Sequence, residues 1–347
     1  MNRLVIFSLF ILIMISRLLC QNSFQSNNHN INFIESDSLP GTNLSDFTFD
    51  RNGNLWIVSL KFNRSQKPIP FSGNFSITSF ISKKENNKYY TIKDSLEFQI
   101  KDIVFDNLNN IYILGSKQIM KLNNEFKFES QFELTEKGGF NSIVFDNSNN
   151  IWVGGLGTGV LKYDGNTWII YNKNNSNIPT NSSTSIFIDK NNIKWITLWE
   201  KKGILKIKNH QWTFFNQVDS NLLNHNFWCA TVDFDNNLWL GTGWQQSPVK
   251  IVQYNGEKWL INNPINDDGK SINGTIRTLF TDFKGNVWSV SSQSKKRTTV
   301  GSLLSKYDGV KWHNIEINDV KVIRKIEIDK NGNIWILSKN RIIQVIE

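Results

Sequence analysis

Cysteine and histidine are scarce in this chain, and their scarcity excludes whole classes of site. The 347 residues include two cysteines, Cys20 and Cys229, and four histidines. Because Cys20 falls in a targeting segment described below, Cys229 is expected to remain as the single thiol, without an internal disulfide. Cys229 lies in the apolar stretch 227–230. A small buried cysteine is the expected role there, and a nucleophile is the alternative.

Long apolar runs and helical patterns are also missing, except at the N-terminus. Arg3 precedes an apolar run over residues 4–16, which is short for a helix that spans a bilayer. We interpret residues 1–20 as a secretory signal peptide and residues 21–30 as a leader, so that the protein is exported to the periplasm, the cell surface or the medium. In the alternative interpretation Cys20 carries a lipid, and the protein is then held at a membrane.

The formal net charge of +9 is scattered along the chain. The densest basic groups are 201–202 and 295–297, and both are expected on loops. Such groups attract anionic polymers. No motif that reads nucleic acid accompanies them, so nucleic acid is not an expected partner.

What the chain has in abundance is one short motif in seven copies. An Asp ends an apolar run, an Asn- and Gly-rich turn follows, and an aromatic residue stands six positions after the Asp. The seven pairs are Asp50 and Trp56, Asp106 and Tyr112, Asp146 and Trp152, Asp189 and Trp195, Asp233 and Trp239, Asp282 and Trp288, and Asp329 and Trp335. The copies recur about every 46 residues, within the range of roughly 40–50 residues for β-propeller blades.

Each copy is typical of a β-hairpin. Asn and Gly tolerate the left-handed backbone of a tight turn, and the Asp carboxylate can accept hydrogen bonds from turn amides. A second hairpin follows, as in 160–168 and 251–259. The sequence therefore predicts four short strands per repeat, and seven such sheets bury their faces by stacking radially. We expect a single all-β domain over residues 31–347, a seven-bladed β-propeller of four-stranded antiparallel blades.

The two ends of the chain predict how the ring closes. The last repeat supplies three strands, at 323–328, 334–338 and 341–346, and no fourth. Residues 31–35 precede the first repeat where an outer strand would lie. We expect this N-terminal strand to complete the last blade, the alternative being a disordered tail.

The Asp-x-x-Gly-Asn-hydrophobic-Trp elements at 50–56 and 329–335, with Gly-Val-Leu-Lys-Tyr-Asp at 159–164, resemble the two-component regulator propeller repeat. The resemblance covers nearly all of the mature chain. Members of that family commonly form the periplasmic sensor portion of bacterial hybrid histidine kinases and often recognise polysaccharide fragments. The resemblance therefore implies ligand recognition. Signalling across a membrane is not implied, because the chain has one propeller and no kinase, and the repeat residues are scaffold rather than binding residues.

Candidate binding residues are those that interrupt the repeat. Ten of the thirteen tryptophans occupy repeat positions, at the start of the second or the fourth strand, and are expected in the core. The other three are Trp199, Trp228 and Trp244. Trp199 and Trp244 follow the second strands of repeats four and five, and Trp228 precedes the first strand of repeat five. All three are expected on one face of the propeller.

Polar residues adjoin these three indoles in the sequence, namely Glu200, His225, Asn226 and Gln245. Indoles ringed by amides and charges suit a sugar, whose C–H face stacks on the ring while its hydroxyls form hydrogen bonds. We expect a non-catalytic recognition module for a poly- or oligosaccharide or another small ligand, with no metal or cofactor. In the alternative, the three tryptophans plug the channel or cover blade edges.

Two other functions stay open. Long loops are expected on the same face at 61–73 and at 291–301, the second carrying Lys295, Lys296 and Arg297, and they would engage another protein of the cell envelope. A lyase or hydrolase would use His225 and Glu200, since some propellers with similar repeats are lyases with His, Glu and a divalent metal. No second His completes such a metal site here.

Overall fold

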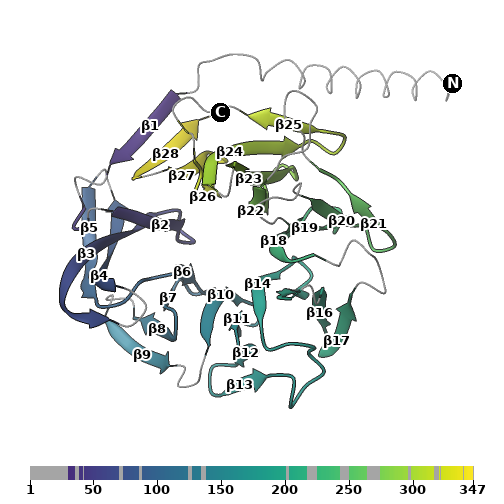
Figure 1. The fold of residues 1–347 in the computed structure, drawn as a ribbon, viewed down its shortest axis with the longest axis horizontal. Helices are drawn as coiled ribbons and strands as arrows, with labels where there is room; N and C mark the ends of the chain where they lie inside the picture. Colours follow the sequence, from purple (N-terminus) through teal and green to yellow (C-terminus); the bar gives the residue numbers. More distant parts are fainter. Residues whose placement is uncertain are drawn as a thin grey trace.

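Seven antiparallel sheets stand in a ring around one axis in the computed structural model, and each has four strands (Figure 1). This is the seven-bladed β-propeller that the repeats predict. The structure describes residues 30–35, 39–41, 43–69, 73–85, 88–123, 127–133, 138–200, 203–216, 225–242, 250–263, 274–295, 298–315, 320, 322–338 and 340–346. Within these ranges no helix is long and apolar enough to cross a membrane. The predicted signal peptide lies outside them.

The strands of each blade follow one another outward from the axis, except in the last blade. Blades one to three contain β2 (Asn43–Phe49), β3 (Leu55–Ile69), β4 (Gly73–Glu85) and β5 (Lys88–Leu96); β6 (Asp102–Phe105), β7 (Ile111–Leu114), β8 (Gln118–Leu122) and β9 (Phe128–Glu133); and β10 (Gly139–Phe145), β11 (Ile151–Leu156), β12 (Val160–Tyr163) and β13 (Trp168–Tyr171).

Blades four to seven repeat this arrangement. They contain β14 (Ser183–Ile188), β15 (Lys194–Leu198), β16 (Ile204–Lys208) and β17 (Gln211–Phe215); β18 (Phe227–Val232), β19 (Leu238–Thr242), β20 (Ile251–Tyr254) and β21 (Trp259–Ile261); β22 (Gly274–Thr281), β23 (Val287–Lys295), β24 (Thr298–Tyr307) and β25 (Trp312–Ile315); and β26 (Lys325–Ile328), β27 (Ile334–Ser338), β28 (Arg341–Ile346) and β1 (Asn30–Glu35).

The up-and-down order of the strands gives the ring two different faces. The seven Asp turns, which join the first strand of each blade to the second, lie on one face, which we call the Asp face. The connections between second and third strands, and those between blades, lie on the other, which we call the loop face.

A buried Asp carboxylate organises each Asp turn. In blade six, Asp282 accepts hydrogen bonds at Oδ2 from Trp288 Nε1 and Asn286 Nδ2, both at 2.8 Å. Its Oδ1 accepts from the backbone N–H groups of Lys284 and Asn286, both at 2.9 Å. Burial opposes ionisation of this carboxyl, but these hydrogen bonds hold the pKa of Asp282 below its ordinary value.

The same bond from indole to carboxylate recurs in five further blades, at 2.8–3.1 Å. Blade two has Tyr112, which has no indole N–H. There Asn149 Nδ2 of the next blade donates to Asp106 Oδ2 at 3.3 Å. Blade three thus supplies to Asp106 the hydrogen bond that an indole N–H donates in the other blades.

The second-strand aromatics form the core between blades. Each packs into the apolar cluster of the following blade, as Trp56 packs against Ile103, Ile111 and Ile113 of blade two. All seven are at most 9% exposed. The fourth-strand tryptophans, Trp168, Trp212, Trp259 and Trp312, are half-buried, so the prediction that they belong to the core is met only in part.

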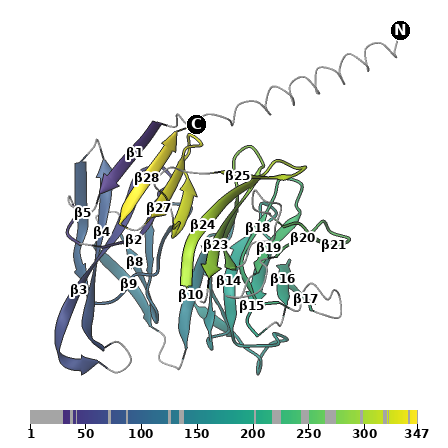
Figure 2. The same cartoon turned by 45° about the horizontal axis from the view of Figure 1, so that its top comes forward.

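An N-terminal strand closes the ring, as predicted. β1 pairs antiparallel with β28, from Asn30 opposite Ile346 to Glu35 opposite Arg341. Figures 1 and 2 show β1, in purple, lying beside the yellow β28. The two ends of the chain are therefore joined by one sheet.

The two predicted long loops are wrong, because both segments are β-hairpins. Residues 61–69 continue β3, and β4 begins at Gly73, with pairing from Lys61 opposite Thr78 to Arg64 opposite Phe75. In blade six, β23 runs to Lys295 and β24 starts at Thr298. Polar and apolar residues alternate over Ser76, Ile77 and Thr78 of β4, and the β3–β4 hairpin projects past the edge of the disc (Figure 2).

Replacing Asp282 with Asn is expected to lower the free energy of unfolding by roughly 2–4 kcal/mol. In either orientation of the new amide, its NH₂ group faces N–H groups that now donate hydrogen bonds to the Asp282 carboxylate. Urea unfolding at neutral pH measures the loss. Because the pKa of Asp282 is lower in the folded than in the unfolded state, the difference from the wild type narrows as the pH falls through the carboxylate range.

Asp164→Asn is the matched control. Asp164 Oδ1 accepts from the N–H groups of Asn166 and Thr167 in the outer turn of blade three. In blade five Asn255 occupies the same place. This change should therefore cost much less stability than Asp282→Asn; an equal loss in both variants would contradict a special role for the buried carboxylate.

The ring closure predicts a specific disulfide. Asn32 lies opposite Gln344 in the β1–β28 ladder. The Cα atoms of such a pair are about 4.5–5.5 Å apart, within disulfide range. The variant Asn32→Cys/Gln344→Cys should oxidise to a cross-linked monomer with a raised melting temperature, seen by mass spectrometry and thermal unfolding. Asn30→Cys/Gln344→Cys, which is out of register, should remain reduced; cross-linking of both pairs would contradict the register.

Candidate ligand-binding site

In five blades a β-bulge near the loop face sets one residue of the first strand apart from the innermost ladder, and in blades two and seven the corresponding residue directly precedes the first strand. Register shifts mark it in blades one, three, four, five and six. The bulge position stands five residues before each Asp and is occupied by Ser45, Lys101, Asn141, Thr184, Trp228, Arg277 and Arg324. Bulges re-aim side chains. These seven residues form a ring around the axis.

Most bulge residues are used to join neighbouring blades. Four of them donate a side-chain hydrogen bond to a carbonyl at the start of the next blade: Lys101 to Phe140, Asn141 to Ser183, Thr184 to Phe227 and Arg324 to Leu44. In blade one Ser45 Oγ donates to Val58 O of its own blade at 3.4 Å. The bulge ring is therefore largely structural.

Trp228 departs from this pattern. It is the second residue of β18 rather than a residue before the strand, so that detail of the prediction is wrong. Its indole packs edge-to-face against that of Trp199, with ring centroids 5.3 Å apart and planes at 85°. Trp228 remains 37% exposed, whereas the second-strand tryptophans are buried. The structure thus brings together two of the three tryptophans that interrupt the repeat.

The connection between β15 and β16 positions Trp199. Its backbone N–H donates to Ser182 O at 3.0 Å, and the preceding Leu198 N–H donates to Gly203 O at 3.0 Å. Glu200 takes a left-handed backbone, with φ +63°, and is exposed on the loop face. Trp199 itself is half-buried.

The polar residues before β18 lie in the same region. His225 and Asn226 directly precede β18 and are half-buried. His225 Nε2 is 3.1 Å from Lys250 Nζ, just before β20. Arg277, the bulge residue of the next blade, is exposed. Indoles, amides and cations therefore occupy adjacent parts of blades four, five and six.

Several predicted site residues lie outside the described ranges. They are Trp244, Gln245, Lys296 and Arg297. Lys295 is the last residue of β23. Lys250 and Arg277 were not among the predicted residues, although aligning the seven repeats on their Asp shows that Arg277 and Trp228 share the bulge position.

Cys229 is a buried structural residue, as predicted. It is 9% exposed, and its Sγ donates to Ile276 O at 3.7 Å. Burial raises the pKa of its thiol to about 12. The thiol is therefore protonated at neutral pH and is a poor nucleophile.

A charged cluster occupies the innermost strands on the other side of the ring. Lys325 Nζ of blade seven is 2.6 Å from Asp46 Oδ1 of blade one and 3.0 Å from Glu327 Oε1. Burial opposes the charge, but these two carboxylates raise the pKa of Lys325. Asp102 of blade two faces the same group, and burial raises the pKa of Asp102 to about 7. The cluster links blades seven, one and two around one ammonium.

No family model matches this sequence, and no curated protein matches it either. Solved structures of similar fold do exist. The extracellular domain of a putative hybrid two-component system from B. thetaiotaomicron is 15% identical, with a TM-score of 0.64, over 92% of this chain and 39% of that domain. Virginiamycin B lyase from Staphylococcus aureus is 11% identical, with a TM-score of 0.66, over 92% of this chain and all of the lyase.

A third similar structure is YCF48 bound to D1 peptide, 14% identical with a TM-score of 0.61, over 93% of this chain and 99% of that one. At these identities the likeness shows the propeller fold alone. Because an extracellular domain of a two-component system, a lyase and a peptide-bound protein share it, function must be argued from the site.

Asp102 is expected to make stability depend on pH. Its pKa is about 7 in the folded protein and roughly 3.9 in the unfolded chain. Between these values the folded state alone keeps the proton, so the free energy of unfolding falls as the pH rises. Relative to the wild type, Asp102→Asn should therefore gain stability from pH 4 to pH 8, measured by thermal unfolding. A difference that stays constant or shrinks over that range would contradict the raised pKa.

Proposed function

We propose that the protein is an exported, non-catalytic recognition module that binds a glycan or another small polyhydroxylated ligand on the loop face. The observation that carries the proposal is the edge-to-face pair of Trp199 and Trp228. At the bulge position four other blades use their residue to join the next blade, whereas blade five holds a large, partly exposed indole there. An exposed aromatic face is a stacking platform for the C–H face of a sugar.

The surroundings of the pair supply hydrogen-bonding groups. His225, Asn226 and Glu200 adjoin the two indoles, and Arg277 lies at the bulge of the next blade. Such convergent polar groups fix the orientation of a ligand whose flat side is stacked. Trp244 and Gln245 belong to the proposed site by their place in the sequence, after the second strand of blade five.

A protein partner is the second candidate function. The β3–β4 and β23–β24 hairpins both extend on the loop face, so that paired strands lie at the edge of that face. An envelope protein could engage these hairpins together with Lys295, Lys296 and Arg297. The lyase hypothesis with His225 and Glu200 has only the fold of virginiamycin B lyase in its favour, and His225 Nε2 already faces Lys250 Nζ.

Trp228→Ala is expected to weaken glycan binding at least tenfold, about 1.4 kcal/mol, because it removes the stacking platform. A glycan array with the purified protein finds the ligand, and isothermal titration then measures the affinity of wild type and variant. Trp199→Ala should act in the same direction, since it removes the support of the Trp228 ring.

Phe128→Ala is the matched control, because Phe128 is a 50% exposed aromatic on the outer strand β9. Its glycan affinity should equal that of the wild type. Wild-type affinity in the Trp228 variant would contradict the glycan site. A silent array, together with specific capture of an envelope protein that is lost on shortening the β3–β4 hairpin, would favour the partner function instead.

A further inference from the structure

The bulge ring on the loop face places an indole beside a guanidinium. Trp228 is the bulged residue of β18 in blade five, and Arg277 is the bulged residue of β22 in blade six. The two strands are in direct contact, because Cys229 Sγ donates to Ile276 O at 3.7 Å. Cys229 directly follows the first bulge and Ile276 directly precedes the second. Trp228 and Arg277 are therefore neighbours around the ring.

A glycine allows blades five and six to approach so closely. A Cβ at Gly241 of β19 would lie 2.6 Å from both Cys229 Sγ and Ile276 Cγ2. The space between the two blades is thus filled beside the bulges. The side chains of Trp228 and Arg277 both remain exposed at the surface.

Arg277 does not join blades as other bulge residues do. Within the described ranges, its side chain forms no hydrogen bond or ion pair. A guanidinium carries five N–H donors in a planar fork. Four other bulge residues, in contrast, donate to a carbonyl of the next blade, namely Lys101, Asn141, Thr184 and Arg324. The donors of Arg277 are thus available to a ligand.

Two further cations lie in the same region. Arg324 is exposed at the next position of the bulge ring, in blade seven. Lys250 directly precedes β20 of blade five, and its Nζ is 3.1 Å from His225 Nε2. Like charges on neighbouring blades repel one another, and an anion bound between them offsets the repulsion. The arrangement of Arg277 and Arg324 therefore favours a negatively charged ligand.

Few carboxylates oppose these cations. The innermost strands of blades four to seven contain one acidic residue, Glu327 of β26. Its Oε1 is 3.0 Å from Lys325 Nζ, which also binds Asp46 of blade one. Glu200 is exposed directly after Trp199. Cations therefore outnumber unpaired carboxylates around the indole pair in the part of the chain that the structure describes.

We propose that the ligand bound at Trp228 is an acidic saccharide. One of its rings stacks on the exposed indole, and a carboxylate or sulfate group of that saccharide is bound by the guanidinium of Arg277. Arginine can form two parallel hydrogen bonds with such a group, and charged hydrogen bonds are about twice as strong as neutral ones. This inference rests on the proposed function, because it names the class of saccharide for the same site.

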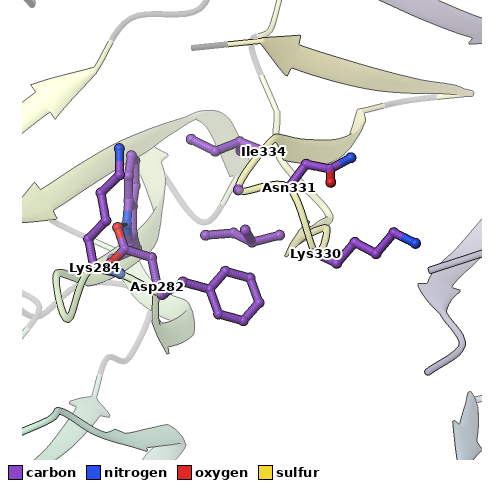
Figure 3. A pocket seen from close by; sticks show the side chains of 9 residues that line it. Asp282, Lys284, Lys330, Asn331 and Ile334 are labelled. Carbon is purple, nitrogen blue, oxygen red and sulfur yellow. Dashed lines mark hydrogen bonds between the residues drawn. The ribbon is translucent and has the colours of Figure 1, made fainter. Parts of the chain in front are cut away.

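The opposite face is less suited to such a ligand. Cavities on the Asp face are small, one of about 160 Å³ between blades six and seven (Figure 3) and another of about 210 Å³ between blades one and two. Pockets for whole ligands span roughly 300–1,000 Å³. The first cavity is lined by Trp288, Ile328 and Ile334, and Lys330 points away from it, with its Nζ bonded to Asn52 O at 2.9 Å.

Matched pairs of glycans test the proposal. The probes are an array of oligosaccharides of uronic acids and of sulfated sugars, each beside its neutral counterpart, a methyl ester or a desulfated form. The neutral form keeps the ring for stacking and lacks the anion. At least one acidic form should bind roughly tenfold more tightly than its counterpart in isothermal titration. The pair that shows the difference identifies the anion as carboxylate or sulfate.

Arg277→Gln removes the charge from an exposed side chain. The affinity for the acidic glycan should fall roughly tenfold, so that the preference over the neutral form is lost. The affinity of the wild type should fall as ionic strength rises, and most of this dependence should disappear in the variant. Arg277→Lys keeps the charge without the planar fork, so it should retain the salt dependence while binding more weakly.

Lys117→Gln is the matched control. Lys117 is exposed between β7 and β8, on the loop face of blade two, and its replacement removes the same charge. Its affinity for the acidic glycan should equal that of the wild type. Trp228→Ala should weaken the acidic and the neutral form by the same factor, because stacking on the indole does not depend on the anion.

The outcomes separate this inference from the proposed function. If neutral glycans bind as tightly as their acidic counterparts, or if Arg277→Gln keeps the acidic preference, the acidic ligand is overturned and the glycan site stands. An array on which no glycan is bound overturns both. Equal losses in Arg277→Gln and Lys117→Gln would assign the preference to the net charge of the face and overturn the role of Arg277.

Discussion

The bond from an indole N–H to a buried Asp carboxylate is the interaction on which the rest of the structure depends. It joins the end of the first strand of a blade to the start of the second, so the hairpin and its aromatic residue are fixed by one short segment. The aromatic ring then packs into the next blade, and the local turn thereby sets the spacing between blades. In blade two, where Tyr112 lacks the N–H, an amide from blade three takes its place, which shows how closely turn and neighbour are coupled.

Two rings of side-chain hydrogen bonds hold the blades together, one near each face. On the loop face, bulge residues such as Asn141 donate to the carbonyl of the next blade. On the Asp face, left-handed Asn residues such as Asn149 accept from the preceding turn. Neither ring is complete: in blade one Ser45 bonds within its own blade, and on the Asp face Gly replaces Asn in blades one, six and seven. The proposed glycan site lies at the bulge position of blade five, where Trp228 leaves part of its indole exposed.

The closed ring holds the proposed glycan site in a fixed frame. The strand β1 joins the two ends of the chain, so no blade can move without breaking either the β1–β28 ladder or a junction. Cavities and stacking platforms in such a frame lose little conformational entropy on binding. The charged cluster around Lys325 adds electrostatic links among blades seven, one and two, and the pKa of Asp102 makes these links sensitive to pH near neutrality.

The repeats alone determined the number of blades, the antiparallel order of strands, the core aromatics and the closing strand, because each of these is encoded by contiguous residues with a regular period. Sequence reasoning also singled out Trp199 and Trp228, since they break the period. Only the tertiary structure decided that Trp228 is the bulged residue of β18, that Arg277 is the bulged residue of β22, and that residues 61–69 continue a strand. The hydrogen bonds between the Asp turns of adjacent blades were likewise invisible, because they depend on packing between turns about one repeat apart. Contacts within a hairpin follow from local sequence, whereas contacts between blades follow from how the finished sheets are stacked.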